Sequence, residues 1–148
     1  MNADELRALD IEIAKALGWH VTKGVLRSPT GTFYGGDYRV DSGAMPETPE
    51  IVEQCWQDYT PRFTKHVDDA LTLVEGLPLS LESAPDSAPE LYGGHRWRAS
   101  ISWQTRVKGR SADTPALAIC LMWLDWHKYA LTDEGRAAEL AWKCDDVS

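Results

Sequence analysis

Apolar positions at helical spacing open the chain. Steps of three and four residues separate Leu6, Leu9, Ile13 and Leu17. Residues spaced in this way share one face of a helix. Asn2 stands before the run, and Glu5 follows it three residues later, which is a pattern typical of an N-terminal cap. Gly18 is a typical helix stop. The pattern therefore predicts an amphipathic helix that begins after Asn2 and ends before Gly18.

Two further segments show helical spacing. An apolar stripe formed by Val67, Ala70, Leu71 and Val74 predicts a second helix, with Thr64 as its cap and Gly76 as its end. Residues 116–131 are apolar on nearly every side and follow Pro115, which suits the first helical position. A helix of this kind is expected to be central and packed against a sheet. Shorter helices are predicted over residues 50–58 and 133–142.

Alternating side chains predict the strands. Residues 95–103 (HRWRASISW) alternate polar or basic with apolar positions, as a half-buried strand does. Residues 104–108 either extend this strand or return as a hairpin. Shorter strands are predicted over residues 21–26, 32–40 and 77–82, and residues 43–49 are expected to form a loop. The order of elements predicts an α/β (α+β) fold, a single-domain sandwich of a small antiparallel or mixed sheet with packed helices.

Composition narrows the class of protein. A chain of 148 residues with 43% hydrophobic and 26% charged residues fits one globular domain over residues 1–148, which folds without a disulfide or a metal. Three cysteines without CxxC spacing predict free thiols in a reducing cytoplasm. The acidic N-terminal segment differs from a signal peptide, and no apolar run has the length of a membrane span. We expect a soluble, cytoplasmic protein without membrane contacts.

Charge is distributed unevenly. The net charge of −8 argues against general nucleic-acid binding. Residues 91–112, however, contain no acidic side chain and carry +5, which leaves −13 for the rest of the chain. The basic residues of this segment are Arg96, Arg98, Arg106, Lys108 and Arg110. Four of the five are arginines, whose planar fork suits phosphate, and Tyr92 supplies an adjacent ring for stacking.

Two interpretations of this basic segment are open. In the first, its five basic residues and Tyr92 bind a small anionic ligand such as a signalling nucleotide. In the second, the segment neutralises acidic side chains packed around it, with Arg96 and Arg98 paired to groups such as Asp68 or Asp69. Removing the charges of Arg96 and Arg98 together is expected to abolish nucleotide binding under the first interpretation only.

Signatures of catalysis are missing from the sequence. The four histidines are scattered without HExxH or His-x-His spacing, and no GxSxG motif is present. Cys120 lies in an apolar run, where a thiol is usually inert. The pairs Gly35-Gly36 and Gly93-Gly94 lack the ending of a phosphate loop. We therefore predict a protein that is not an enzyme, with no metal site and no cofactor.

The tryptophans suggest a core and a contact surface. Trp97, Trp103 and Trp123 fall on faces predicted to be apolar, so we place them in the core. Trp126 and Trp142 lie where the last predicted helices leave the apolar stripe. If exposed, these two rings would favour a partner or a homo-oligomer.

Three blocks of the chain resemble the phage ABA sandwich domain, a family of small phage and prophage proteins. The blocks are LDIEIAKALGW, PRFTKHVDDALTLVEGL and ADTPALAICLMWLDW, at residues 9–19, 61–77 and 112–126. The family shares a helix ending in Gly-Trp, a helix with a Pro-aromatic-Ser/Thr start, and a late Thr-Pro-Ala-Leu-Ala-aliphatic-Cys helix. Relative to this pattern, residues 20–60 are an insertion and residues 130–148 are a C-terminal extension.

The resemblance implies an α/β sandwich in the cytoplasm of a bacterial host. By analogy with small phage proteins that sequester the nucleotide signals of bacterial immunity, it suggests an accessory binding protein with an anti-defence role. One alternative is a protein–protein interaction module, such as an acidic inhibitor that mimics a nucleic acid. A hydrolase that uses the scattered His and Asp residues is a further class, and it would consume its ligand.

Overall fold

A computed structural model describes residues 1–103 and 106–130 of the chain. The chain divides into two compact units, Met1–Thr64 and Lys65–Ser148, and each is described by itself. Each unit combines helices with one antiparallel three-stranded sheet, which confirms the α+β class. The prediction of a single domain over residues 1–148 stays a prediction.

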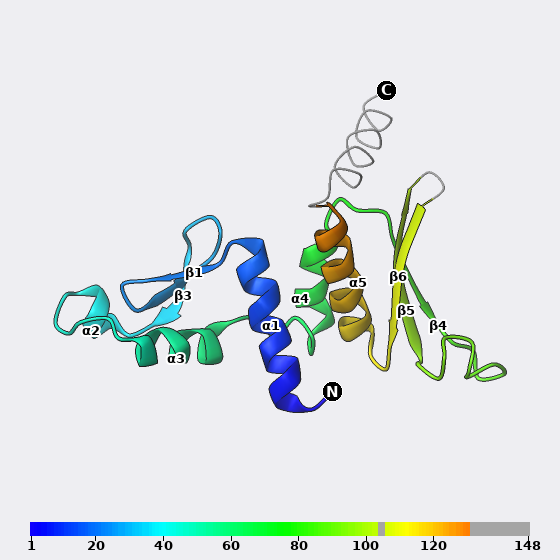
Figure 1. The fold of residues 1–148 in the computed structure, drawn as a ribbon, viewed down its shortest axis with the longest axis horizontal. Coiled ribbons are helices and arrows are strands. Elements are labelled where there is room, and N and C mark those ends of the chain that lie inside the picture. The colour runs from blue at the N-terminus through cyan, green and yellow to red at the C-terminus, as the bar shows by residue number, and fades with distance from the viewer. Residues whose placement is uncertain (104–105, 131–148) are drawn as a thin grey trace, which may run out of the picture. The chain divides into compact units, whose positions relative to one another are not determined.

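The first unit consists of three helices and one sheet. Its elements are α1 (Ala3–Leu17), β1 (His20–Thr22), β2 (Val25–Arg27), β3 (Phe33–Gly36), α2 (Tyr38–Asp41) and α3 (Pro49–Tyr59). The strands follow one another in the order β1-β2-β3. Helix α3 packs against this sheet (Figure 1). Ile13, Val25 and Leu26 are completely buried and form the core of the unit.

The ends of α1 confirm the local signals in the sequence. The Asn2 side chain accepts a hydrogen bond from the backbone N–H of Glu5 at 2.8 Å. Gly18 ends the helix with a φ of 98°, in the left-handed region that glycine adopts without a steric penalty. The predicted helix over residues 50–58 is also confirmed as α3, which begins one residue earlier, at Pro49.

The predicted strands of this unit are shorter in the structure. A single strand over residues 21–26 is wrong, because Lys23 and Gly24 both have positive φ values, 53° and 69°. They form a two-residue turn that pairs β1 with β2. The strand predicted over residues 32–40 is also wrong beyond Gly36. There the Asp37 side chain accepts the backbone N–H of Arg39 and caps α2.

The second unit has a second sheet with helices on one face. Its elements are α4 (Val67–Leu71), the 3-10 helix η1 (Thr72–Val74), β4 (Leu79–Ser83), β5 (Trp97–Trp103), β6 (Arg106–Ala112) and α5 (Pro115–Ala130). The strand order is β4-β5-β6. Helix α5 packs on β5 and β6, and α4 packs on α5 (Figure 1). Ile101, Ile119 and Met122 are completely buried.

Several predictions about this unit are decided by its geometry. The strand over residues 95–103 is confirmed as β5, and β6 returns beside it as a hairpin. The start of the apolar helix is confirmed as well, since Thr114 Oγ1 accepts the backbone N–H of Leu117. Thr64 as the cap of the second helix is wrong. His66 stands at that position without a side-chain cap, and the Thr64 hydroxyl donates to Asp10.

The aromatic predictions are confirmed in part. Trp123 is buried as expected, whereas Trp97 is half-buried. Trp126 is only 8% exposed, so the exposed patch predicted there is wrong for this residue. Trp142, the helix predicted over residues 133–142 and most of the predicted extension lie outside the described residues. Within the described residues, no helix has the length and apolar character needed to cross a bilayer.

Candidate functional site

The basic segment forms a β-hairpin and the turn before it, and this geometry separates its cations. Arg98 of β5 is paired with Ser111, whereas Lys108 and Arg110 of β6 are paired with Ile101 and Ala99. Paired residues point to the same face of a sheet, and successive residues point to opposite faces. Lys108 and Arg110 therefore share the face that packs on α5, and Arg98 lies on the opposite face.

Two arginines of the basic segment lie near carboxylates. Arg110 Nη1 donates to Asp125 Oδ2 of α5 at 2.9 Å. Arg96 approaches Asp86 at 4.0 Å, and its side chain is 63% exposed. Lys108 is half-buried and makes contacts of its own. Arg106 is paired with Trp103 along the backbone, and its side chain lies outside the described side chains.

Tyr92 and Arg98 do come together, around Glu82 of β4. The Tyr92 hydroxyl donates to Glu82 Oε2 at 2.8 Å, and this hydrogen bond raises the pKa of Tyr92 because the phenolate would face a carboxylate. Arg98 is directly opposite Glu82 in the sheet register. Its guanidinium covers Gly109, where a Cβ atom would overlap it. The cluster joins two of the six predicted ligand-binding residues, but it contains a carboxylate.

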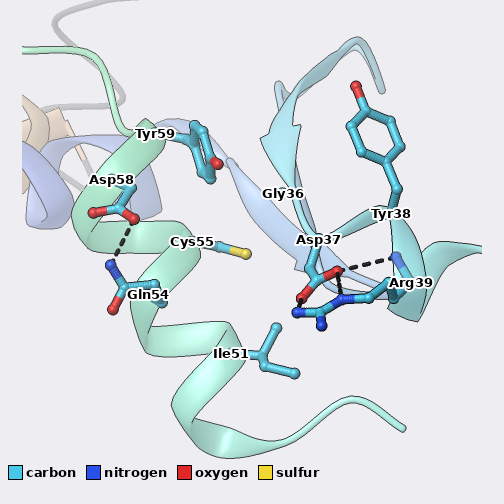
Figure 2. A pocket seen from close by; sticks show the side chains of 9 residues that line it. All are labelled: Gly36, Asp37, Tyr38, Arg39, Ile51, Gln54, Cys55, Asp58 and Tyr59. Atoms are coloured by element: carbon cyan, nitrogen blue, oxygen red, sulfur yellow. Dashed lines mark hydrogen bonds and ion pairs between the residues drawn. The ribbon is translucent and has the colours of Figure 1, made fainter. Parts of the chain in front are cut away.

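A second candidate site, which the sequence did not predict, lies in the first unit. A cavity of about 380 Å³ opens between α3 and the segment that joins β3 to α2 (Figure 2). Its volume falls within the range of roughly 300–1,000 Å³ that small-ligand sites occupy. The lining residues are Gly36, Asp37, Tyr38, Arg39, Ile51, Gln54, Cys55, Asp58 and Tyr59. We name this volume the α3 cavity.

Two consecutive glycines allow β3 to approach its neighbours closely. A Cβ atom at Gly35 would overlap the ring of Tyr59, which lies against the strand at this point. A Cβ atom at Gly36 would overlap the backbone of Gly24 and Val25 in the adjacent strand. A glycine in a strand often marks such a close approach. The Gly35-Gly36 pair is therefore the sequence signal that could have indicated this site.

Asp37 and Arg39 form an ion pair in the α3 cavity and satisfy each other's charge. Asp37 accepts hydrogen bonds from the backbone N–H and Nε of Arg39, each at 3.0 Å, and from its Nη2 at 2.8 Å. These hydrogen bonds lower the pKa of Asp37 and raise the pKa of Arg39, because each stabilises the charged form of the group. The two charges cancel within the pair.

Asp58 supplies the remaining charge of the α3 cavity. Its Oδ2 accepts a hydrogen bond from Gln54 Nε2, which lies one helical turn earlier on α3 (Figure 2). Among the described residues, no cation lies within ion-pair distance of Asp58. The cavity therefore has a net negative charge, which a second carboxylate nearby, Glu47, reinforces.

The thiol of Cys55 responds to this negative environment. Cys55 is buried, and its Sγ donates to the carbonyl of Gly24 at 3.2 Å. Burial raises the pKa of the Cys55 thiol, and the negative charges of Glu47, Asp37 and Asp58 raise it further. A thiol held in its protonated form is a poor nucleophile. The surroundings of Cys55 therefore do not activate its thiol as a nucleophile.

Two exposed tyrosine rings line the α3 cavity, and an exposed phenylalanine ring stacks on one of them. Tyr38 is 68% exposed, and Phe33 and Tyr59 are each 39% exposed. The rings of Phe33 and Tyr38 stack with a centroid distance of 5.3 Å and an interplanar angle of 21°. Tyr59 packs over Gly35 of β3, whereas Phe33 lies opposite Arg27 beyond a shift in the strand register. We name Phe33, Tyr38 and Tyr59 the aromatic face.

The described residues offer no ready metal centre. No group of three or more His, Cys, Asp or Glu side chains among them could hold a metal ion. Every buried side-chain nitrogen or oxygen in this part of the chain has a hydrogen-bond partner. What this part of the molecule presents is therefore a pair of surfaces, the basic hairpin in one unit and the α3 cavity with its aromatic face in the other.

Comparisons with known proteins add little to this geometry. Neither a protein-family model nor a curated protein matches the chain. One solved structure to which it is similar is a phage protein from Bacillus cereus ATCC 14579. The identity is 17%, the alignment covers 84% of this chain and 89% of that one, and the TM-score is 0.47. The membership of the phage ABA sandwich family that the sequence suggests therefore stays a prediction.

Proposed function

We propose that the protein acts by binding rather than by catalysis, and that its partner is a protein with a basic surface. The observation that carries this proposal is the placement of three exposed rings beside a negatively charged cavity in the first unit. The partner class matches the interaction module that the sequence allows, including an acidic inhibitor of a nucleic-acid-binding protein.

The aromatic face has the composition of a protein contact surface. Tyrosine and phenylalanine are enriched in the cores of interfaces, where large rings bury apolar area at a low cost in side-chain entropy. Tyr38 is 68% exposed although its ring stacks on Phe33, so much of this apolar ring area stays in contact with water. A partner that covers this stack would remove both rings from water.

Charge selects the kind of partner. The chain carries a net charge of −8, and the α3 cavity adds a local carboxylate that no described cation compensates. Complementary potentials accelerate association and exclude partners of like charge. A basic protein surface therefore fits both the whole chain and this site, whereas a polyanion fits neither.

Selection from a displayed library of random peptides tests the proposal. The immobilised full chain is expected to enrich peptides that combine a basic side chain with apolar neighbours. A double variant, Phe33→Ser with Tyr38→Ser, is expected to lose this enrichment because it removes the stacked rings without emptying the core. Leu91→Ser is the matched control, since Leu91 is also exposed, at 59%, but belongs to the second unit.

Two results of this selection would contradict the proposal. One is enrichment of acidic or neutral peptides, and the other is an enrichment that the ring variant retains to the same extent as the Leu91→Ser control. Circular dichroism of the variants checks that each chain keeps its fold. Raising the salt concentration should lower the affinity of the selected peptides for the chain, because their attraction is partly electrostatic.

A second candidate function is sequestration of a small anionic, nucleotide-like ligand by the basic segment, in an anti-defence role. The observation in its favour is Arg96, which is 63% exposed and meets its nearest carboxylate only at 4.0 Å. Arg96 also lines a small cavity of about 150 Å³ together with Gly94. A ligand bound there would raise the unfolding free energy by RT ln(1 + [L]/Kd), and the melting temperature would rise with it.

A further inference from the structure

The α3 cavity has room for one extended side chain and a defined set of hydrogen-bonding groups. Its apolar contacts come from Ile51 and the rings of Tyr38 and Tyr59. Its polar groups come from Gln54 and Asp58 on α3 and from the Asp37–Arg39 pair on the opposite side (Figure 2). The two sides of this site are therefore unequal, since one side presents a closed ion pair and the other presents an open carboxylate.

Asp58 is the group with unused hydrogen-bonding capacity. An ionised carboxylate offers about four acceptor positions. The only hydrogen bond that Asp58 accepts within the described residues is the one from Gln54 to Oδ2. Gln54 is neutral, so the charge of Asp58 is not compensated by this contact. A cationic donor placed in the cavity would gain a charge-assisted hydrogen bond, which is stronger than a neutral one.

Arg39 does not oppose a cation in this cavity. Its guanidinium is held by Asp37 through two side-chain hydrogen bonds at 3.0 Å and 2.8 Å, so the pair presents no net charge. Cys55 also lines the cavity, and the raised pKa of its thiol keeps this group uncharged at neutral pH. Glu47 is a further carboxylate that acts on Cys55, and it accepts the backbone N–H of Gly24 at 2.5 Å, so it adds negative rather than positive charge near the cavity.

Tyr59 supplies a ring beside the carboxylate. It follows Asp58 in the chain, lines the same cavity and is held in place against Gly35. A cation over the face of a tyrosine ring is attracted by the ring quadrupole. A guanidinium is flat and weakly hydrated, so it can stack on a ring while its N–H groups bond to a carboxylate, which an ammonium group does less well.

We infer that the α3 cavity binds an arginine side chain of the partner, with the guanidinium between the Tyr59 ring and the Asp58 carboxylate. This inference rests on the proposed function, because it names the part of the basic partner that the first unit recognises. The aromatic face then covers the residues of the partner that flank this arginine.

Nuclear magnetic resonance of the isotope-labelled full chain tests the inference with N-acetyl-arginine amide. This probe carries its only charge on the side chain. It is expected to shift the backbone amides of residues 37–39 and 54–59 with a Kd on the order of 1 mM, as is usual for a ligand of this size. N-acetyl-citrulline amide has nearly the same shape without the charge, and it is expected to bind about tenfold more weakly.

A pair of variants on one helix separates the site from the charge of the chain. Asp58→Asn keeps the shape of the side chain and is expected to weaken the binding of N-acetyl-arginine amide about tenfold. Glu53→Gln removes one negative charge from the same helix. Glu53 accepts a hydrogen bond from Gln57 at 3.2 Å and does not line the cavity, so this variant is expected to bind as the original chain does.

Three outcomes would overturn the arginine site: no saturable shift with N-acetyl-arginine amide, equal affinity for the citrulline probe, or unchanged affinity in Asp58→Asn. Peptide selection that still depends on the aromatic face would then leave the proposed function in place. Conversely, arginine binding at Asp58 combined with a peptide selection that ignores the rings would overturn the proposed function and support the cavity alone.

Discussion

The basic hairpin of the second unit and the α3 cavity of the first unit differ in how their charged groups are arranged. In the hairpin, the cations are close together in sequence but divided between two faces of a sheet, and Arg110 is hydrogen-bonded to Asp125. In the α3 cavity, the charged groups come from separate segments and face one volume. The density of charge along a chain is therefore a weaker guide to a site than the convergence of charge in space.

The two surfaces also differ in what surrounds their charges. Arg110 and Asp125 are 45% and 37% exposed, so water and salt screen their attraction. Asp58 is exposed as well, but it borders a concave volume lined by tyrosine rings and Ile51. A ligand that fills this volume excludes water from the carboxylate, and an ion pair in a less polar environment is stronger. Asp58 in the first unit is therefore better placed than Asp125 in the second unit to bind a cationic ligand.

The largest expected effect concerns the carboxylate that holds the first unit together. Asp10 is 3% exposed and accepts hydrogen bonds from the backbone N–H and the hydroxyl of Thr64, both at 2.8 Å. It also pairs with Arg7 at 3.3 Å, and Arg7 donates twice to the Gln57 carbonyl on α3. Asp10→Ala removes the buried acceptor of the Thr64 N–H and hydroxyl and of Arg7 Nη1, although Arg7 keeps its hydrogen bonds to Gln57. We therefore expect a loss of about 2–4 kcal/mol of unfolding free energy.

Asp125→Ala in the second unit is the matched comparison for this loss. Asp125 accepts one hydrogen bond from an arginine, as Asp10 does, but both partners are more than a third exposed. We expect Asp125→Ala to cost about 0–1 kcal/mol. Hydrogen exchange of the amides of α3 and α5 measures the two units separately. Equal losses in the two variants would show that the burial of Asp10 does not set its contribution.

A smaller effect is expected from the basic hairpin, and only under the second candidate function. Arg96→Ala with Arg98→Ala removes two adjacent cations of the hairpin, and Arg98 is the one that lies opposite Glu82. If the segment sequesters nucleotides, calorimetric titration with cyclic and linear adenine nucleotides should give binding to the original chain. The double variant should then lose at least about tenfold in affinity, which is 1.4 kcal/mol.

Arg110→Ala is the control for this titration. Arg110 lies on the opposite face of the sheet and is bonded to Asp125, so its removal should leave nucleotide affinity unchanged. An equal loss in Arg110→Ala would restore the six-residue site that the sequence predicts and would reverse the comparison between the two surfaces. No binding by the original chain would remove the second candidate function.

The sequence predicts the helices of this protein better than its turns and sites, because helix ends depend on local signals. Asn2, Gly18 and Pro115 act through their own backbone and nearest neighbours, and each marks the end it was expected to mark. The β1–β2 turn was missed because Lys23 takes a left-handed conformation that its residue type rarely adopts. Nothing in the local sequence indicates that conformation.

The candidate sites show the same limit. Alternation along residues 95–103 was readable from the sequence, but the pairing of β6 with β5 was not, since residues 104–108 allowed two paths. Without that register, the separation of Arg98 from Lys108 and Arg110 could not be predicted. The α3 cavity joins residues 36–39 to residues 51–59, and only tertiary packing brings these segments together. The Gly35-Gly36 pair was visible, but its use became clear only from the ring of Tyr59.

The smallest expected effect is a change in the pKa of Cys55, which depends on the electric field in the α3 cavity. Its thiol has a raised pKa relative to the ordinary value of 9.0, first through burial and then through Glu47, Asp37 and Asp58. Asp58→Asn removes one of these charges, so we expect the pKa of Cys55 to fall. The pH dependence of the NMR shift of the Cys55 Cβ atom measures this change directly.

The sign of the linked stability effect follows from the raised pKa. Well below pH 9.0 the thiol is protonated in both the folded and the unfolded chain, so the unfolding free energy does not depend on its titration there and is at its full value. Above that pH the unfolded chain loses the proton first, and the first unit loses stability as the pH rises. Asp58→Asn should reduce this loss, whereas Arg98→Ala in the second unit should leave it unchanged. A titration of Cys55 that ignores Asp58 would show that this carboxylate does not act across the cavity, and the arginine site would lose its electrostatic basis.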